Sequence, residues 1–137
     1  MFEFDGPPLR MYNCHCSRCR RAVSAGYQTV VRARLGGFRW LAGPEKITGY
    51  RMPGTRFECA FCTACGSRTP WERGEQVCVP AGCLDNDPAK KPSDNIFTVS
   101  RAAWTGRATR DLAGSPSMES LVAFAANHIV IHSPSVQ

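Results

Sequence analysis

The sequence predicts a mainly β domain whose sheets are largely antiparallel. Short runs of strand-like composition alternate with glycine and proline at intervals of about ten residues, which is typical of antiparallel β proteins. The expected elements do not alternate in the order strand, helix, strand that is typical of a βαβ fold. The single long helical pattern lies near the carboxyl end, over residues 116–131.

The first expected element is a short strand at the amino end. Phe2 and Phe4 alternate there with polar residues, and a Gly-Pro-Pro sequence at 6–8 ends the run. A metal-binding knuckle that leads into a short helical turn is expected over 14–22, and a strand over 27–34. Further strands are expected at residues 38–41, 47–52, 56–61, 76–80 and 96–100.

The carboxyl-terminal helix is expected over residues 116–131. Apolar residues there, including Leu121 and Phe124, recur at the spacing that places them on one helical face. We therefore divide the chain into a domain over 1–113 and a helix with a frayed tail over 114–137.

Size and composition indicate a soluble globular domain. A chain of 137 residues buries about two-thirds of the surface that its unfolded form exposes, so a metal need not replace an apolar core. No apolar stretch approaches the ~20 residues of a membrane span. The amino end shows no export signal, so we expect a cytoplasmic protein with reduced thiols.

The net charge of +6 comes mainly from arginine, since only Lys46, Lys90 and Lys91 are lysines among 17 basic residues. Arginine favours planar, bidentate partners such as carboxylates and phosphates. The arginines are dispersed, with no run of five basic residues, so an acidic small molecule suits the pattern at least as well as nucleic acid does.

Six of the eight cysteines fall into two clusters, over residues 14–19 and 59–65. Where thiols stay reduced, clustered cysteines hold a metal more often than they form disulfides. A disulfide framework is the alternative if the protein is exported. The spacing therefore favours zinc as the cofactor.

The first cluster supplies three thiolates within six residues: Cys14, Cys16 and Cys19. Residues two apart on an extended segment point to the same side, so Cys14 and Cys16 would face one ion while His15 faces away. Two residues then separate Cys16 from Cys19, the usual knuckle spacing. A structural zinc takes four protein ligands and a catalytic one takes three, so this cluster predicts a zinc with one open position.

Basic side chains follow the first cluster on the expected helical turn. Arg18, Arg20 and Arg21 would favour deprotonation of the thiols and could attract an anionic substrate. The alternative is a merely solvated basic face. Arg18 and Arg21 are the candidates for substrate binding.

The second cluster contains a knuckle, Cys62-x-x-Cys65, which by itself has too few sulfurs for a stable zinc site. Cys59 is an alternative third ligand, but on a strand it would face oppositely to Cys62, so we expect it in the core. Cys78 and Cys83 are isolated and are expected to be small buried hydrophobic residues.

These motifs resemble the glutathione-dependent formaldehyde-activating enzyme family, whose domain is also seen in centromere protein V. Four motifs at compatible intervals carry the resemblance, and together they extend over most of the chain. The matching segments are residues 13–22, 61–67, 81–85, and 95–97 with 100–104.

The resemblance implies a domain of twisted antiparallel sheets, a β-tent, that binds two zinc ions. By the same resemblance Cys14, Cys16 and Cys19 match the zinc site that has an open position. Cys62 and Cys65 match half of a structural site with four cysteines.

The sequence departs from the family pattern in two places. The other pair of the structural site, a Cys-x-Cys-Gly on the first strand, would lie just before Phe2. We therefore expect that the natural chain starts upstream, and occupation of the second zinc site depends on this. Asp94 and Asn95 stand where relatives often carry histidine, which bears on substrate handling.

The resemblance implies the reversible combination of formaldehyde with glutathione to give S-(hydroxymethyl)glutathione, a carbon–sulfur lyase reaction. We expect the open zinc to bind the substrate thiol as thiolate. No side chain is identified as the general acid or base, since His128 and His132 on the expected terminal helix suit packing or the surface.

Two other functions fit the same residues. A non-catalytic zinc module could bind a protein or nucleic acid, although only Tyr12 and Tyr27 provide aromatic rings near the first cluster for stacking on bases. Thiol redox chemistry at Cys62 and Cys65 is less favoured, because no βαβ pattern surrounds them. The sequence does not indicate the oligomeric state.

Overall fold

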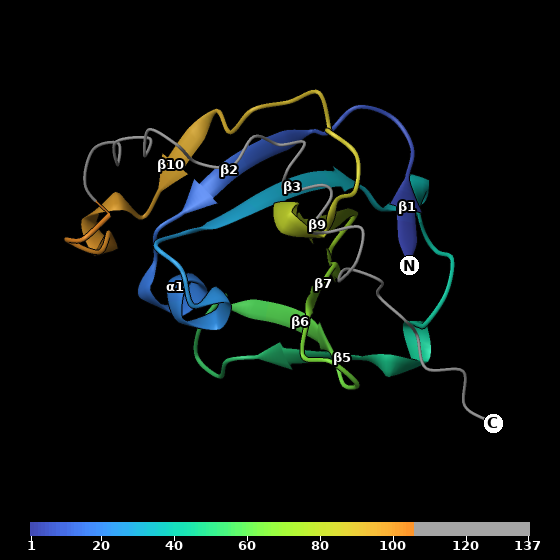
Figure 1. The fold of residues 1–137 in the computed structure, drawn as a ribbon, viewed down its shortest axis with the longest axis horizontal. Coiled ribbons are helices and arrows are strands. Elements are labelled where there is room, and N and C mark those ends of the chain that lie inside the picture. The colour runs from blue at the N-terminus through green and yellow to red at the C-terminus, as the bar shows by residue number, and fades with distance from the viewer. Residues whose placement is uncertain (106–137) are drawn as a thin grey trace, which may run out of the picture. The chain divides into compact units, whose positions relative to one another are not determined.

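The computed structural model describes residues 1–105, which form three β-sheets and one short α-helix (Figure 1). The predicted helix over 116–131, the boundary after residue 113 and the histidines of the carboxyl end lie outside these residues. No helix within 1–105 is both long and apolar enough to span a membrane.

The largest sheet has five strands, and all neighbouring strands in it are antiparallel except for one pair. That pair is β10 and β2, which run parallel, with Ile96 opposite Cys14. The prediction of a mainly antiparallel β fold is confirmed. The strand order is β10 (Asp94–Ile96), β2 (Arg10–Cys14), β3 (Gln28–Arg34), β9 (Gln76–Pro80) and β8 (Trp71–Arg73).

Two smaller antiparallel sheets complete the described part of the chain. In Figure 1 the three-stranded sheet lies across from β2 and β3, with the helix α1 (Ser17–Val23) at one end of the space between them. The two-stranded sheet pairs β1 (Phe2–Phe4) with β4 (Phe38–Trp40). The three-stranded sheet consists of β5 (Ile47–Arg51), β6 (Glu58–Cys62) and β7 (Arg68–Thr69).

Most predicted elements are confirmed within two residues, including the helical turn after the first cysteines, but one strand is wrong. The strand predicted over 96–100 ends at Ile96, because Phe97 adopts a left-handed conformation with φ of 56°. Residues Thr98–Ser100 then form a 3₁₀ turn. The sequence patterns also missed three strands, β2, β7 and β8.

The two faces of the five-stranded sheet carry different groups of side chains, because neighbouring residues of a strand project to opposite sides. We call one group the apolar core and the other the cysteine face. The apolar core consists of Met11, Val31, Ala33, Val77 and Val79, packed by Phe2, Phe4 and Phe38 among others. The cysteine face consists of Tyr12, Cys14, Val30 and Cys78, packed by Cys16, Cys19, Trp71 and Ile96.

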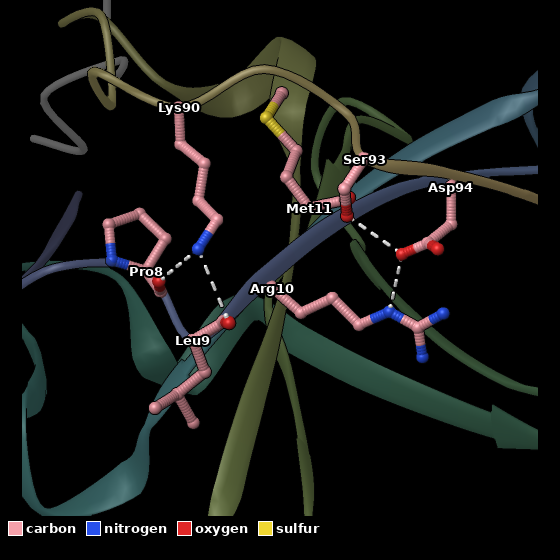
Figure 2. Close-up of polar contacts among 7 residues, drawn as sticks. All are labelled: Pro8, Leu9, Arg10, Met11, Lys90, Ser93 and Asp94. Atoms are coloured by element: carbon pink, nitrogen blue, oxygen red, sulfur yellow. Dashed lines mark hydrogen bonds and ion pairs between the residues drawn. The ribbon is translucent and has the colours of Figure 1, made fainter.

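Polar contacts fasten the segment before β10 to the start of β2 (Figure 2). Arg10 Nε lies 2.9 Å from Asp94 Oδ2, and the Ser93 hydroxyl donates to the same oxygen at 2.7 Å. Lys90 Nζ donates to the carbonyl of Pro8 at 3.0 Å. These contacts hold β10 beside the end of β2, where the first cysteine cluster begins.

Candidate metal centre

The turn from β2 into α1 brings together the three sulfurs of the first cluster. Cys14 is the last residue of β2, Cys16 is the N-cap of α1, and Cys19 lies in its first turn. Their Sγ atoms all lie within 4.8 Å of one another, so the group could hold a metal ion. The structure thus assembles the three cysteines that the spacing predicts.

The backbone of the turn supports these sulfurs directly. Cys16 is extended, with φ of −61° and ψ of 148°, and its sulfur accepts a hydrogen bond from the backbone N–H of Cys19 at 3.3 Å. The helix ends at Val23. Ser24 follows in a left-handed conformation, and its backbone N–H donates to carbonyls of the last turn. An N–H group aimed at sulfur offsets the negative charge of a thiolate ligand.

The three thiols perturb one another strongly. The pKa of Cys14 is lowered to about 6, chiefly by a hydrogen bond from the Cys19 thiol and also by hydrogen bonds from Cys16, against the opposing effect of burial. The pKa of Cys19 is raised, because it donates to Cys14 and is buried. Cys14 is therefore a thiolate at neutral pH, while Cys19 beside it resists deprotonation. A bound cation would stabilise both sulfurs as thiolates.

Burial differs across the group. Cys14 is 4% exposed and belongs to the cysteine face, whereas Cys16 and Cys19 are half-buried at the start of α1. Three sulfurs also leave one position free on a tetrahedral ion. The chemistry and number of the donors fit a thiolate-bound metal that keeps a position for an added ligand.

His15 lies between Cys14 and Cys16 in the sequence, but it does not belong to the group that could hold a metal. Its ring is buried, lies tilted at 53° to the ring of Tyr27 with centroids 5.2 Å apart, and places Nε2 2.9 Å from Asn95 Oδ1. Since an amide oxygen only accepts, Nε2 is the donor. The backbone N–H of His15 also donates to the carbonyl of Ile96 at 3.0 Å. The sequence patterns gave no indication that the turn with the three cysteines is attached to β10.

The predicted substrate-binding arginines lie on the surface of α1. Arg18 and Arg21 are exposed, and no carboxylate within residues 1–105 lies in ion-pair distance of either. Arg20 instead bends back so that its Nε donates to the carbonyl of His15 at 3.3 Å. The outer side of the turn is therefore positively charged.

The second knuckle has a different environment. Cys62 ends β6 and is half-buried, whereas Cys65 is exposed and its thiol donates to the Ser67 hydroxyl at 3.2 Å. The Ser67 contacts and the Cys62 side chain lower the pKa of Cys65. Within the described chain no third cysteine, histidine or carboxylate joins Cys62 and Cys65 in a metal-binding group.

The remaining cysteines are largely structural. Cys59 and Cys78 are buried, at 7% and 0% exposure, as expected of core residues. Cys83 departs from the expectation of a buried hydrophobic residue: it is half-buried, and its thiol donates to the carbonyl of Arg68 at 2.9 Å. The 3₁₀ turn that follows β9 places it there.

Comparisons with known proteins agree with the sequence motifs. A sequence model of the family described as glutathione-dependent formaldehyde-activating enzyme matches residues 1–100. The search of curated proteins gives no match. Among solved structures, the chain is similar to a Rhodobacter sphaeroides protein, with 27% identity and a TM-score of 0.50. That similarity covers 63% of this chain and 80% of the other.

Proposed function

Since the chain belongs to the glutathione-dependent formaldehyde-activating enzyme family, we propose that it is a zinc-dependent, carbon–sulfur lyase-like enzyme. Its substrate would be a thiol–aldehyde adduct such as S-(hydroxymethyl)glutathione. The observation that carries the proposal is the group of three sulfurs within 4.8 Å at the turn from β2 into α1. In the synthetic direction the thiol loses its proton, its sulfur bonds to the aldehyde carbon, the carbonyl electron pair moves to oxygen, and that oxygen takes a proton.

Cys14, Cys16 and Cys19 are the proposed zinc ligands. When bound there, zinc would supply the positive charge that lowers the pKa of a substrate thiol at the open position. The cysteines hold the site on the cysteine face, and the half-buried Cys16 and Cys19 form the side that a ligand can approach. We assign the proton transfers to no side chain.

The exposed arginines of α1 would act on the substrate before it binds. Glutathione carries two carboxylates, and Arg18 and Arg21 have no acidic partner within residues 1–105. Their charges would raise the local concentration of an anionic thiol at the site. The proposal includes a cytoplasmic location, where both glutathione and the cysteines stay reduced.

For a second zinc, we propose only two of the four ligands. Cys62 and Cys65 would supply half of a structural site, and the other ligands would have to come from outside residues 1–105. This zinc would stabilise the hairpin region around β6 and take no part in the reaction.

The test compares zinc content per chain and the exchange of formaldehyde with glutathione, followed by NMR, in the wild type and Cys16→Ser. We expect the variant to lose one zinc and to lose the acceleration of exchange. Cys83→Ser, which changes a half-buried thiol outside the group, is the control. A wild type that binds zinc and does not accelerate exchange would instead favour a non-catalytic zinc module.

A further inference from the structure

Among residues 1–105, three hydrogen-bond donors on β3 and β8 are buried without a partner. They are Gln28 Nε2, Arg32 Nε and Trp71 Nε1. Buried donors are nearly always paired, because desolvation of an unpaired N–H group is unfavourable. Three such donors in one region point to a ligand with several acceptor atoms.

Strand register places all three donors on the cysteine face. Gln28 lies directly opposite Cys14 in the pair of β2 and β3. Arg32 lies opposite Cys78, and Cys78 lies opposite Trp71. Residues directly opposite each other project from the same side of a sheet. The donors therefore extend from a proposed zinc ligand across β3, β9 and β8.

Arg32 forms no ion pair with a carboxylate of the described chain. Its guanidinium cannot lose its proton. Its charge is felt on this face: burial raises the pKa of Tyr12 and of Cys78, and Arg32 opposes both shifts. The Arg32 Nε–H is buried without a partner, so an anion that accepted a hydrogen bond from it would satisfy this donor.

The three side chains that carry these donors differ in burial, although the donor atoms themselves are all buried. Arg32 and Trp71 are half-buried rather than sealed, while Gln28 is 4% exposed and lies deepest, beside Cys14. Arg32 follows Gln28 by four residues on β3, a distance of about 13 Å along an extended strand. A thiol held near Cys14 would need its anionic group several bonds from its sulfur to approach Arg32.

We propose that the cysteine face binds the carboxylate of an extended thiol substrate, with Arg32 as its ionic partner and Trp71 Nε1 as a second donor. Gln28 donates to a carbonyl nearer the sulfur. Short neutral thiols lack the anchoring group, so Arg32 would distinguish them from a thiol that carries a carboxylate. This inference rests on the proposed function. It makes Arg32 the anchor, and leaves the exposed arginines of α1 to attract the substrate.

The test follows thiol binding to cobalt-substituted protein by the visible absorption of Co²⁺, without turnover. The probes are glutathione, its dimethyl ester and 2-mercaptoethanol. We expect Arg32→Gln to weaken glutathione binding by at least about tenfold and to leave 2-mercaptoethanol unchanged. The dimethyl ester should bind the wild type and the variant alike. Arg34→Gln is the matched control, because Arg34 is the exposed arginine two residues further along β3.

The outcomes separate this inference from the proposed function. If thiols bind but Arg32→Gln weakens none of them, or all of them equally, the carboxylate site is wrong and the enzyme proposal stands. If no thiol changes the Co²⁺ spectrum of the wild type, the proposed function itself fails. Should Arg32→Gln fail to fold, Trp71→Phe removes one donor and keeps a ring, and it should weaken glutathione binding alone. Equal binding of all probes by Trp71→Phe and the wild type would also overturn the carboxylate site.

Discussion

Cys14 differs from the other two sulfurs of the centre in burial and in charge. It is 4% exposed, yet the hydrogen bond from Cys19 holds its pKa at about 6. Free cysteine titrates at about 8.5. The lowered pKa means that the folded, metal-free protein already presents one thiolate at neutral pH, which is the form that binds a metal.

The first prediction concerns this thiolate. In reduced, metal-free protein Cys14 should be deprotonated at pH 7 and should take up its proton as the pH falls through about 6. The measurement is the ultraviolet thiolate absorbance of the wild type minus that of Cys14→Ser over a pH titration. Cys78→Ser is the control, because burial raises the pKa of Cys78 and it should contribute nothing at pH 7. Equal absorbance of Cys14→Ser and the wild type at pH 7 would contradict the prediction.

The three sulfurs could be predicted from the sequence because their arrangement is local. Six consecutive residues and one helical turn decide where they lie, so the spacing alone indicates the group. Arg32 and Gln28 give no such signal. Their relation to Cys14 comes from the pairing of β2 with β3 and of β3 with β9, which brings distant residues to one face.

At the level of elements, the strands that the sequence indicated are those bounded by glycine or proline. β9 (Gln76–Pro80) was predicted with its observed limits, because an apolar run there ends at proline. β7 has two residues and β8 has three, too few to show an alternation. β2 ends in the knuckle, so its residues gave no separate strand pattern.

The pairing of β10 with β2 could not be predicted from sequence either. The pattern over 96–100 suggested a strand, but the pairing residues are Asp94–Ile96, and the left-handed Phe97 ends them. Parallel pairing joins segments about eighty residues apart, for which local patterns carry no information. This pairing is what places Asn95 against His15.

The second prediction tests that contact. Asn95→Ala removes the acceptor of His15 Nε2 and should free the turn that carries the three cysteines, so zinc affinity should fall about 10–100-fold. Asn95→Asp keeps an oxygen acceptor and should retain most of the affinity. Competition with a chromophoric chelator measures both, and the Co²⁺ spectrum of each variant reports the geometry of the site.

Loss of the contact must be distinguished from detachment of β10. Asp94→Ala breaks the ion pair with Arg10 shown in Figure 2, whose side chains are 50% and 42% exposed. An exposed pair contributes less than about 1 kcal/mol to the free energy of unfolding. Asp94→Ala should therefore bind zinc like the wild type. If it loses as much affinity as Asn95→Ala, the docking of β10 and not the His15 contact controls the site.

At the scale of the whole molecule, the five-stranded sheet carries the residues that stabilise the fold on one face and the candidate metal centre on the other. The apolar core lies on one face and the cysteine face on the other, so substitutions on the two faces should have different consequences. The third prediction is that Met11→Ala, in the apolar core, lowers the free energy of unfolding by about 2–5 kcal/mol. Its zinc content should equal that of the wild type. Denaturant unfolding and metal analysis check the two parts, and loss of zinc from folded Met11→Ala would contradict the separation.

The same separation predicts the effect of removing the metal. Val31, Val77 and Val79 are fully buried in the apolar core, on the face opposite to the sulfurs, so the sheet has an interior that needs no ion. Small zinc-finger domains lack such a core and unfold when the metal is removed. Chelated protein should therefore keep its far-ultraviolet circular dichroism and still unfold cooperatively, at a lower temperature, because a ligand of the native state no longer contributes to stability.

Added zinc should restore the unfolding temperature of the wild type and should leave that of Cys16→Ser unchanged, because the variant lacks one of the three sulfurs. Thermal unfolding with and without zinc, at fixed protein concentration, makes the comparison. Loss of the β spectrum on chelation alone would show that the ion, and not the apolar core, holds the strands together. In that case zinc would be structural at this position, and a free coordination site for substrate would lose its support.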